Sequence, residues 1–175
     1  NRIEGAKLGG IGVIDSGGNG DIVTIRANEI VGNSGYGVAV FGGEVMVDGN
    51  QISTVAGDDD DEDAHCISVS GTEVGPAIVQ VLGNSIQGCS GAGVLLDGVA
   101  SSNVDDNTIE QSTLGGIVLQ LDADASVSGN TIIEPGVAGL SLWSGSSAQI
   151  IGNSISLVST VGIFDYATQE TVPHA

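Results

Sequence analysis

Basic residues are almost missing from this chain. Three lysine or arginine residues stand against 22 aspartate or glutamate residues among 175, which gives a formal net charge of −19 at pH 7. A protein of this charge repels phosphate groups and anionic lipid surfaces. We therefore expect no nucleic acid among its partners.

Aromatic residues and long apolar runs are also scarce. Aromatic side chains make up 3% of the chain, whereas 41% of the residues are hydrophobic and glycine occurs 29 times. The core must therefore consist of small and branched aliphatic side chains, with frequent turns. No apolar run approaches the roughly 20 residues of a membrane-spanning helix, so no membrane insertion is expected.

The abundant feature is a repeat built on asparagine. An asparagine recurs two residues before an isoleucine at Asn1, Asn28, Asn50, Asn84, Asn107, Asn130 and Asn153. The steps between them are 27, 22, 34, 23, 23 and 23 residues. A period of this length indicates a solenoid. Because the chain begins inside a repeat, we interpret it as part of a longer chain.

Apolar residues keep fixed positions around each asparagine. Two residues after it lie Ile3, Ile30, Ile52, Ile86, Ile109, Ile132 and Ile155, and three residues before it lie Ile25, Val47, Val81, Val104, Val127 and Ile150. A third run, usually behind a glycine, carries the pairs Val38 and Val40, Ile67 and Val69, Val94 and Leu96, Ile117 and Leu119, and Leu140 and Leu142. The pattern predicts three short strands per coil, with these side chains pointing inward.

The asparagines themselves are expected to stack. Adjacent strands lie about 4.8 Å apart, so side-chain amides at one turn can bond from coil to coil. The expected ladder comprises Asn28, Asn50, Asn84, Asn107, Asn130 and Asn153. Asparagine tolerates left-handed backbone angles, and the glycine that often precedes it relieves crowding in the turn.

The stretches "VMVDGNQI", "VQVLGNSI" and "AQIIGNSI" resemble repeats of the right-handed parallel β-helix proteins, the superfamily of pectate lyases, polygalacturonases and many exported proteins. The resemblance covers nearly the whole chain. It implies an all-β, single-stranded right-handed parallel β-helix of about six to seven coils over residues 1–166, with a C-terminal tail at residues 167–175. It also implies an extracellular or cell-surface location. A leucine-rich repeat is the competing solenoid, but "GGIVLQLD" alternates as a strand between glycines.

The catalytic motifs of those enzymes are missing. Pectate-lyase-like elimination needs a base near carboxylate-bound calcium, whereas Arg2, Lys7 and Arg26 all fall in the first coil and its approach. The N-T-D, D-D, G-H-G and R-I-K motifs of polygalacturonase-like hydrolysis do not occur at the expected positions. Asp97 and Asp122 are either a glycosidase-type pair or two solvated turn residues. We expect a non-catalytic scaffold; the alternative is a lyase or hydrolase fragment with degenerate or missing catalytic residues.

An acidic insertion lengthens the coil that follows Asn50. It carries six consecutive acids, Asp58, Asp59, Asp60, Asp61, Glu62 and Asp63. Ca²⁺ would neutralise such a run and order it through oxygen ligation. The alternative is a solvated acidic loop without a ligand. Calcium is thus the one cofactor that the sequence suggests.

Two cysteines, Cys66 and Cys89, occupy corresponding corners of successive coils. Two cysteines in a small exported-type scaffold commonly form a disulfide, which is the first interpretation. Buried free thiols are the alternative. A zinc site formed by His65 with both cysteines lacks any supporting ligand spacing.

The strand behind the glycine is expected to carry the functional surface. Its outward residues in the C-terminal half are Leu95, Asp97, Val118, Gln120, Trp143, Phe164 and Tyr166. Exposed apolar patches mark interaction sites. We expect this binding surface to contact a protein partner, a second copy of the chain or a polysaccharide, or else to be covered by the C-terminal tail.

The two end coils break the inward pattern. Asp15 and Asp165 stand where other coils have valine or leucine. A carboxylate is costly inside an apolar stack. These coils are therefore expected either to be loosened or to shift their register.

Overall fold

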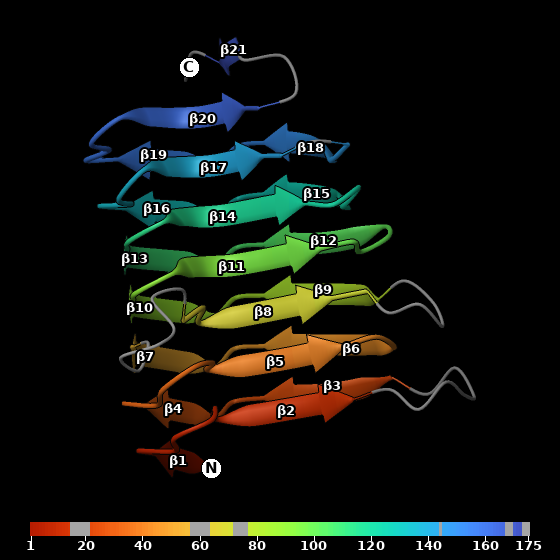
Figure 1. The fold of residues 1–175 in the computed structure, drawn as a ribbon, viewed down its shortest axis with the longest axis vertical. Helices are drawn as coiled ribbons and strands as arrows, with labels where there is room; N and C mark the ends of the chain where they lie inside the picture. Colours follow the sequence, from red (N-terminus) through yellow and green to blue (C-terminus); the bar gives the residue numbers. More distant parts are fainter. Residues whose placement is uncertain (15–21, 57–63, 72–76, 144, 167–169, 173–175) are drawn as a thin grey trace.

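The computed structural model describes residues 1–14, 22–56, 64–71, 77–143, 145–166 and 170–172. Within these ranges the chain forms strands and turns and no helix, and three sheets run the length of the molecule (Figure 1). It follows that the described part of the chain contains no helix long and apolar enough to cross a membrane.

Sheet A consists of β1 (Arg2–Glu4), β4 (Glu29–Val31), β7 (Gln51–Val55), β10 (Ser85–Cys89), β13 (Thr108–Ser112), β16 (Thr131–Ile133) and β19 (Ser154–Ser156). Sheet B consists of β2 (Ile11–Ile14), β5 (Val38–Phe41), β8 (Ile67–Ser70), β11 (Ala92–Asp97), β14 (Gly115–Gln120), β17 (Ala138–Leu142), β20 (Val161–Asp165) and β21 (Glu170–Val172). Sheet C consists of β3 (Val23–Arg26), β6 (Glu44–Asp48), β9 (Ile78–Leu82), β12 (Ser102–Asp105), β15 (Asp124–Ser128) and β18 (Ser147–Ile151).

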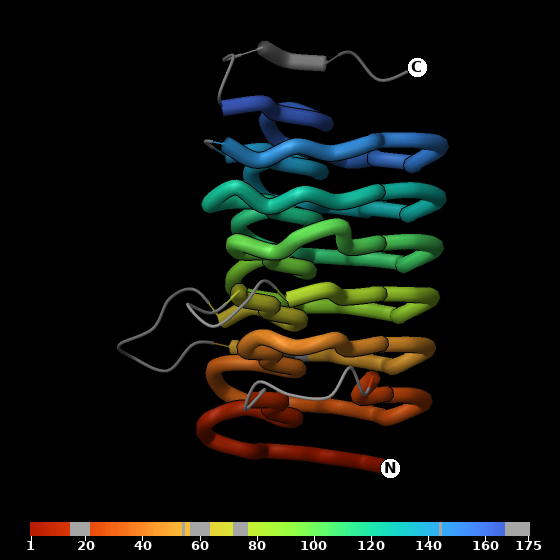
Figure 2. Tube along the Cα trace, turned by 90° about the vertical axis from the view of Figure 1, so that its right-hand side faces the viewer, coloured from red at the N-terminus to blue at the C-terminus, as the bar shows by residue number. Residues whose placement is uncertain are grey.

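Each coil contributes one strand to each sheet in the order A, B, C, and the coils stack on one another along the long axis (Figure 2). Strands β1 to β18 make six such coils, and β19 and β20 begin a seventh. Neighbouring strands pair in parallel with equivalent residues opposite one another; Ile86, for example, pairs with Ile52 in the coil before and Ile109 in the coil after. The predicted solenoid of six to seven coils is confirmed.

The predicted inward residues form one continuous core. The isoleucines that follow the asparagines are fully buried in the central coils, and so are the valines that precede them. Burial of one such side chain contributes roughly 1.5 to 3 kcal/mol. At the C-terminal end, Ile150 and Ile155 are only partly buried, because fewer coils cover them.

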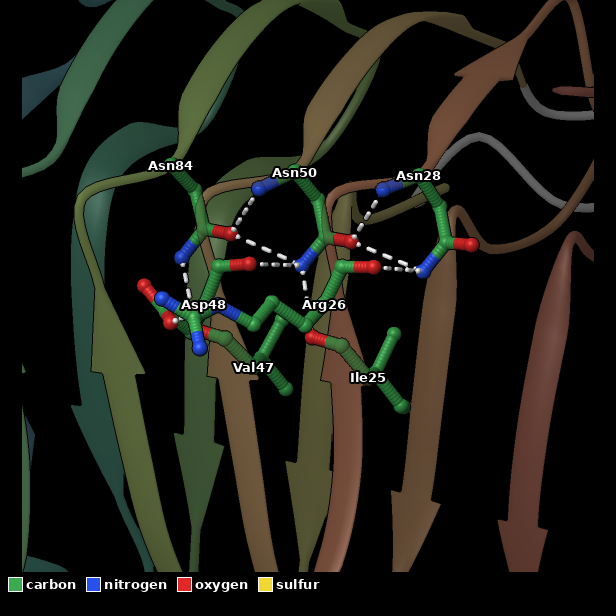
Figure 3. A network of polar contacts seen from close by, with 7 residues as sticks. All are labelled: Ile25, Arg26, Asn28, Val47, Asp48, Asn50 and Asn84. Carbon is green, nitrogen blue, oxygen red and sulfur yellow. Dashed lines mark hydrogen bonds and ion pairs between the residues drawn. The ribbon is translucent and has the colours of Figure 1, made fainter. Parts of the chain in front are cut away.

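The asparagines form the ladder of hydrogen bonds drawn in part in Figure 3. The Asn50 side chain donates to the Asn84 Oδ1 at 3.0 Å, and the Asn84 Nδ2 donates to the Asn107 Oδ1 at 2.9 Å. Each Oδ1 also accepts the backbone N–H of the preceding ladder residue, as Asn84 does from Asn50 at 2.9 Å. The same pattern continues to Asn153.

The left-handed residue at this turn is the one before each asparagine. Positive φ angles occur at Gly49, Gly83, Gly129 and Gly152 and, without glycine, at Ala27 (52°) and Asp106 (55°). No described ladder asparagine has a positive φ. The expectation that asparagine takes left-handed angles there was wrong, because its amide must turn inward to bond along the stack while the preceding residue makes the turn.

A second set of equivalent glycines lies at the turn where the chain passes from a strand of sheet A to a strand of sheet B. A Cβ on Gly116 would come within 2.5 Å of the Ile132 Cγ2 and 2.6 Å of the Gly139 carbonyl oxygen. In the third coil, Cys66 holds this position instead of a glycine. It directly precedes Ile67, which pairs with Val38, and its carbonyl accepts a hydrogen bond from the Val38 N–H. The glycines therefore leave room for the isoleucines of the next coil.

Cys66 and Cys89 form a disulfide in the structure, with their Cα atoms 5.6 Å apart. Cys66 precedes β8 and Cys89 ends β10, so the bond joins the third coil to the fourth across the corner between sheets B and A. Both residues are buried. Because the two sulfurs are bonded to each other, the zinc interpretation does not fit this arrangement.

The end coils keep their register. Asp165 pairs with Leu142 in the parallel ladder and is half-buried in the partial last coil. Of the two expected alternatives, a loosened coil or a register shift, the strand register is therefore not shifted at the C-terminal end. Asp15 lies outside the described residues. Strand β21 pairs antiparallel with β20 at the edge of sheet B (Figure 1), so the described part of the tail does not cross the face of that sheet.

Candidate functional site

A groove with a volume of about 310 Å³ runs along the outer face of sheet B. Its floor is formed by Ala92, Leu95, Val118 and Ser141. These side chains point away from the core, and yet Leu95 is 9% and Val118 is 7% exposed. The groove is therefore a recess with an aliphatic floor, separate from the core.

Two walls border this floor. Leu114 and Val137 form the first wall and lie just before β14 and β17, at 39% and 42% exposure. Gln120, Trp143 and Tyr166 form the second wall at the ends of β14 and β17 and just beyond β20. Partly exposed apolar side chains on both sides of an apolar floor suit a ligand with its own apolar surface.

The second wall is stiffened by aromatic contacts. The Trp143 and Tyr166 rings stack with centroids 3.8 Å apart and an interplanar angle of 12°. Phe164 meets Tyr166 edge to face at 4.2 Å. The stacked rings are closer than the coil spacing of about 4.8 Å because they lean into contact, which such ring pairs favour. One face of the Trp143 ring is covered by Tyr166, and the residue as a whole is 42% exposed.

Polar groups occur at the entrance and along the rim. The His65 Nδ1 accepts a hydrogen bond from the Ala92 N–H at 2.9 Å, which orients this imidazole at the end of the groove nearest the third coil. Asp97 pairs with Gln120 in the β11–β14 register and is half-buried. The lining thus offers an imidazole and an amide, and a carboxylate lies one strand away from the amide.

Most of the predicted binding surface lies at this groove. Leu95, Val118, Gln120, Trp143 and Tyr166 line it, whereas Asp97 lies one coil before Gln120, outside the lining, and Phe164 contacts Tyr166. The binding surface predicted from the sequence left out five lining residues, His65, Ala92, Leu114, Val137 and Ser141. Leu114 and Val137 are 23 residues apart and hold the same repeat position, so a full alignment of the coils could have found them.

The other candidate sites are not assembled in the described residues. Asp97 pairs with Gln120, so Asp122 lies two residues past the position opposite Asp97, in the turn where Leu121 and Asp122 have positive φ angles. Residues 58–63, the candidate calcium loop, lie outside the described residues. Within the described ranges no group of three or more histidine, cysteine or acidic residues could hold a metal ion.

Three parallel sheets wound coil by coil, with an asparagine ladder inside one corner, define a parallel β-solenoid. The family described as "Right handed beta helix region" matches residues 1–155. The chain therefore belongs to the right-handed β-helix family. No curated protein and no solved structure matches the chain.

Proposed function

We propose that this chain is a non-catalytic binding module of an exported or cell-surface protein, and that the groove on sheet B holds an extended segment of a partner. The observation that supports this is the groove itself, with buried Leu95 and Val118 between two partly exposed apolar walls. Solvent-exposed recesses of this kind mark binding sites more often than idle surface.

The length of the groove supports a chain-like ligand. Its lining runs from His65 in the third coil to Tyr166 in the seventh, which is four coil steps or about 19 Å. About six residues of an extended peptide cover that length. The aliphatic first wall, the mainly aliphatic floor and the aromatic rings of the second wall favour a protein segment.

A polysaccharide is the second candidate occupant. It is supported by the exposed Trp143 ring, which lies beside the Gln120 amide in the same wall. Aromatic faces pack on the apolar faces of sugars, while amides bond their hydroxyls. Both candidates use the same groove.

The test uses Trp143 as its reporter, because it is the only tryptophan of the chain. Short peptides with apolar side chains and soluble polysaccharides are titrated while the tryptophan emission is recorded. We expect a variant with Leu114→Ser and Val137→Ser to weaken binding about tenfold, since it removes one apolar wall.

Ile151→Ser is the matched control, because Ile151 is also an exposed aliphatic residue but lies on sheet C. It should leave the affinity unchanged. Sedimentation of all variants reports self-association in parallel. The proposed function would be contradicted if the ligands bound the double variant as tightly as the control variant. It would also be contradicted if no ligand changed the Trp143 emission.

A further inference from the structure

The groove lies in a part of the molecule without lysine or arginine. Among the described residues these are Arg2, Lys7 and Arg26, all in the first coil, whereas the groove begins in the third. Arg2 pairs with Glu29 and Glu4, and the hydrogen bond with Glu29, followed by that with Glu4, raises the pKa of Arg2 above its usual value. With a net charge of −19, the molecule as a whole attracts cationic ligands more than anionic ones.

Gln120 and Trp143 of the second wall continue a row that begins at Asp97, which is not itself part of the lining, and the three residues follow one another at single-coil steps. Asp97 pairs with Gln120, and the Trp143 N–H donates to the Leu119 carbonyl at 2.8 Å, which places Trp143 opposite Gln120. A carboxylate, an amide and an aromatic ring therefore succeed one another at about 4.8 Å per step.

The ring face of Trp143 that is turned away from Tyr166 is directed toward the coil of Gln120, and the residue is 42% exposed. Tyr166 belongs to the next coil and covers the opposite face, since its N–H donates to the Leu142 carbonyl at 2.7 Å and its ring stacks on Trp143. A planar cation placed over Gln120 would lie on the open indole face and one step from the Asp97 carboxylate. Its attraction to the ring and to the carboxylate would act together.

We infer that the groove recognises a basic, partly apolar peptide segment of a partner protein, with an arginine side chain between Trp143 and Asp97 and neighbouring apolar side chains on Leu95 and Val118. The inference rests on the proposed function and names its occupant. The negative charge of the protein disfavours the binding of polyuronates and other anionic chains, and it also disfavours the binding of a second copy of this acidic chain.

The experiment compares two short peptides in which leucine alternates either with arginine or with citrulline, the neutral analogue of arginine. Binding to the whole chain is followed by the Trp143 emission at low ionic strength. We expect the arginine peptide to bind at least about tenfold more tightly, and we expect salt to reduce this preference.

The protein variants locate the preference. Asp97→Asn should abolish most of it, and Asp124→Asn is the matched control because it removes the same charge from sheet C. Trp143→Leu, measured by calorimetry, should weaken the arginine peptide more than the citrulline peptide. An unchanged preference in the Asp97→Asn variant overturns the inference.

Other outcomes separate this inference from the proposed function. Equal binding of both peptides that still requires Leu114 and Val137 overturns the cationic occupant and leaves the groove as the site. The same holds if a neutral oligosaccharide binds through these walls while neither peptide binds. Binding that depends on neither wall contradicts both proposals.

Discussion

At the scale of the residue, the asparagine ladder shows how a buried amide can stabilise a core. The Asn107 Nδ2 donates to the carbonyls of Val81 at 2.8 Å and Asp105 at 3.1 Å and to the Asn130 Oδ1 at 3.0 Å. The Asn107 Oδ1 accepts two hydrogen bonds from Asn84. Every polar group of this side chain is thus satisfied, which removes most of the cost of its burial.

Asn107→Ala is expected to lower the free energy of unfolding by about 3 kcal/mol, because it leaves buried donors of Asn84 and carbonyls of the turn without partners. Asn153→Ala is the control, since Asn153 is only half-buried at the end of the ladder and should cost about 1 kcal/mol. Urea denaturation followed by circular dichroism measures both. Equal losses would contradict the ladder as a source of stability.

The set of equivalent glycines between sheets A and B gives a second prediction. Gly116→Ala should destabilise the protein by about 2 kcal/mol, because its Cβ would overlap Ile132 and the Gly139 carbonyl in a packed core. Gly12→Ala is the control: its Cβ meets nothing within 4 Å, and Ala39 holds the paired position in β5. It should be neutral or stabilising by about 0.5 kcal/mol. Thermal unfolding of both variants decides this.

At the scale of the element, the parallel strands separate their negative charges, whereas the antiparallel pair of β20 and β21 places Asp165 opposite Glu170. In every parallel register of the described strands, an acidic residue pairs with a neutral or a basic residue in the neighbouring coil. Some neutral neighbours also donate hydrogen bonds, as the Ser128 Oγ does to Asp105 at 2.6 Å and the Ser147 Oγ does to Asp124 at 2.7 Å. Stacked strands therefore tolerate a highly acidic composition.

Ser128→Asp should break this arrangement. It places a second carboxylate about 4.8 Å from Asp105 and removes a hydrogen bond, so we expect a loss of about 1 to 2 kcal/mol at low ionic strength. Ser126→Asp adds the same charge two residues earlier in β15, between the neutral Asn103 and Gln149, and should cost less. Unfolding at low and at high salt tests the idea. If the difference in unfolding free energy between the two variants did not decrease at high salt, charge repulsion would not be its cause.

At the scale of the whole molecule, each coil contacts only its neighbours. The central coils bury their isoleucines completely, whereas Ile11 and Val13 at one end and Ile150 and Ile155 at the other are only partly buried. In a solenoid, stability is close to a sum of coil terms and interfaces between neighbours. The molecule is therefore not expected to be equally stable along its length.

Amide hydrogen exchange should show this gradient. We expect the slowest exchange in the strands from β7 to β14, which include the two coils joined by the Cys66–Cys89 disulfide, and faster exchange toward β1 and β19. Reduction of the disulfide should accelerate exchange in β8 and β10 first, since a bond that closes a loop of this length contributes about 3 kcal/mol. Uniform protection along the chain would contradict this prediction.

The period of the sequence determined the architecture. A side chain that returns every 23 residues must stack on its equivalent, and the alternation of apolar and polar residues decides which side chains face inward. For this reason the core, the three strands per coil and the asparagine positions followed from residue order alone. The family-typical "GNSI" stretches added the handedness.

Only the tertiary structure decided how the outward residues combine. Leu114 and Val137 form a groove wall because the turn between sheets A and B places them beside Leu95 and Val118. Trp143 and Tyr166 lean together, and β21 adds to the edge of sheet B instead of covering its face. Outward positions are not constrained by core packing, so their neighbours depend on how corners and turns bend the chain. The pattern of a repeat records which side chains face inward but does not record that bending.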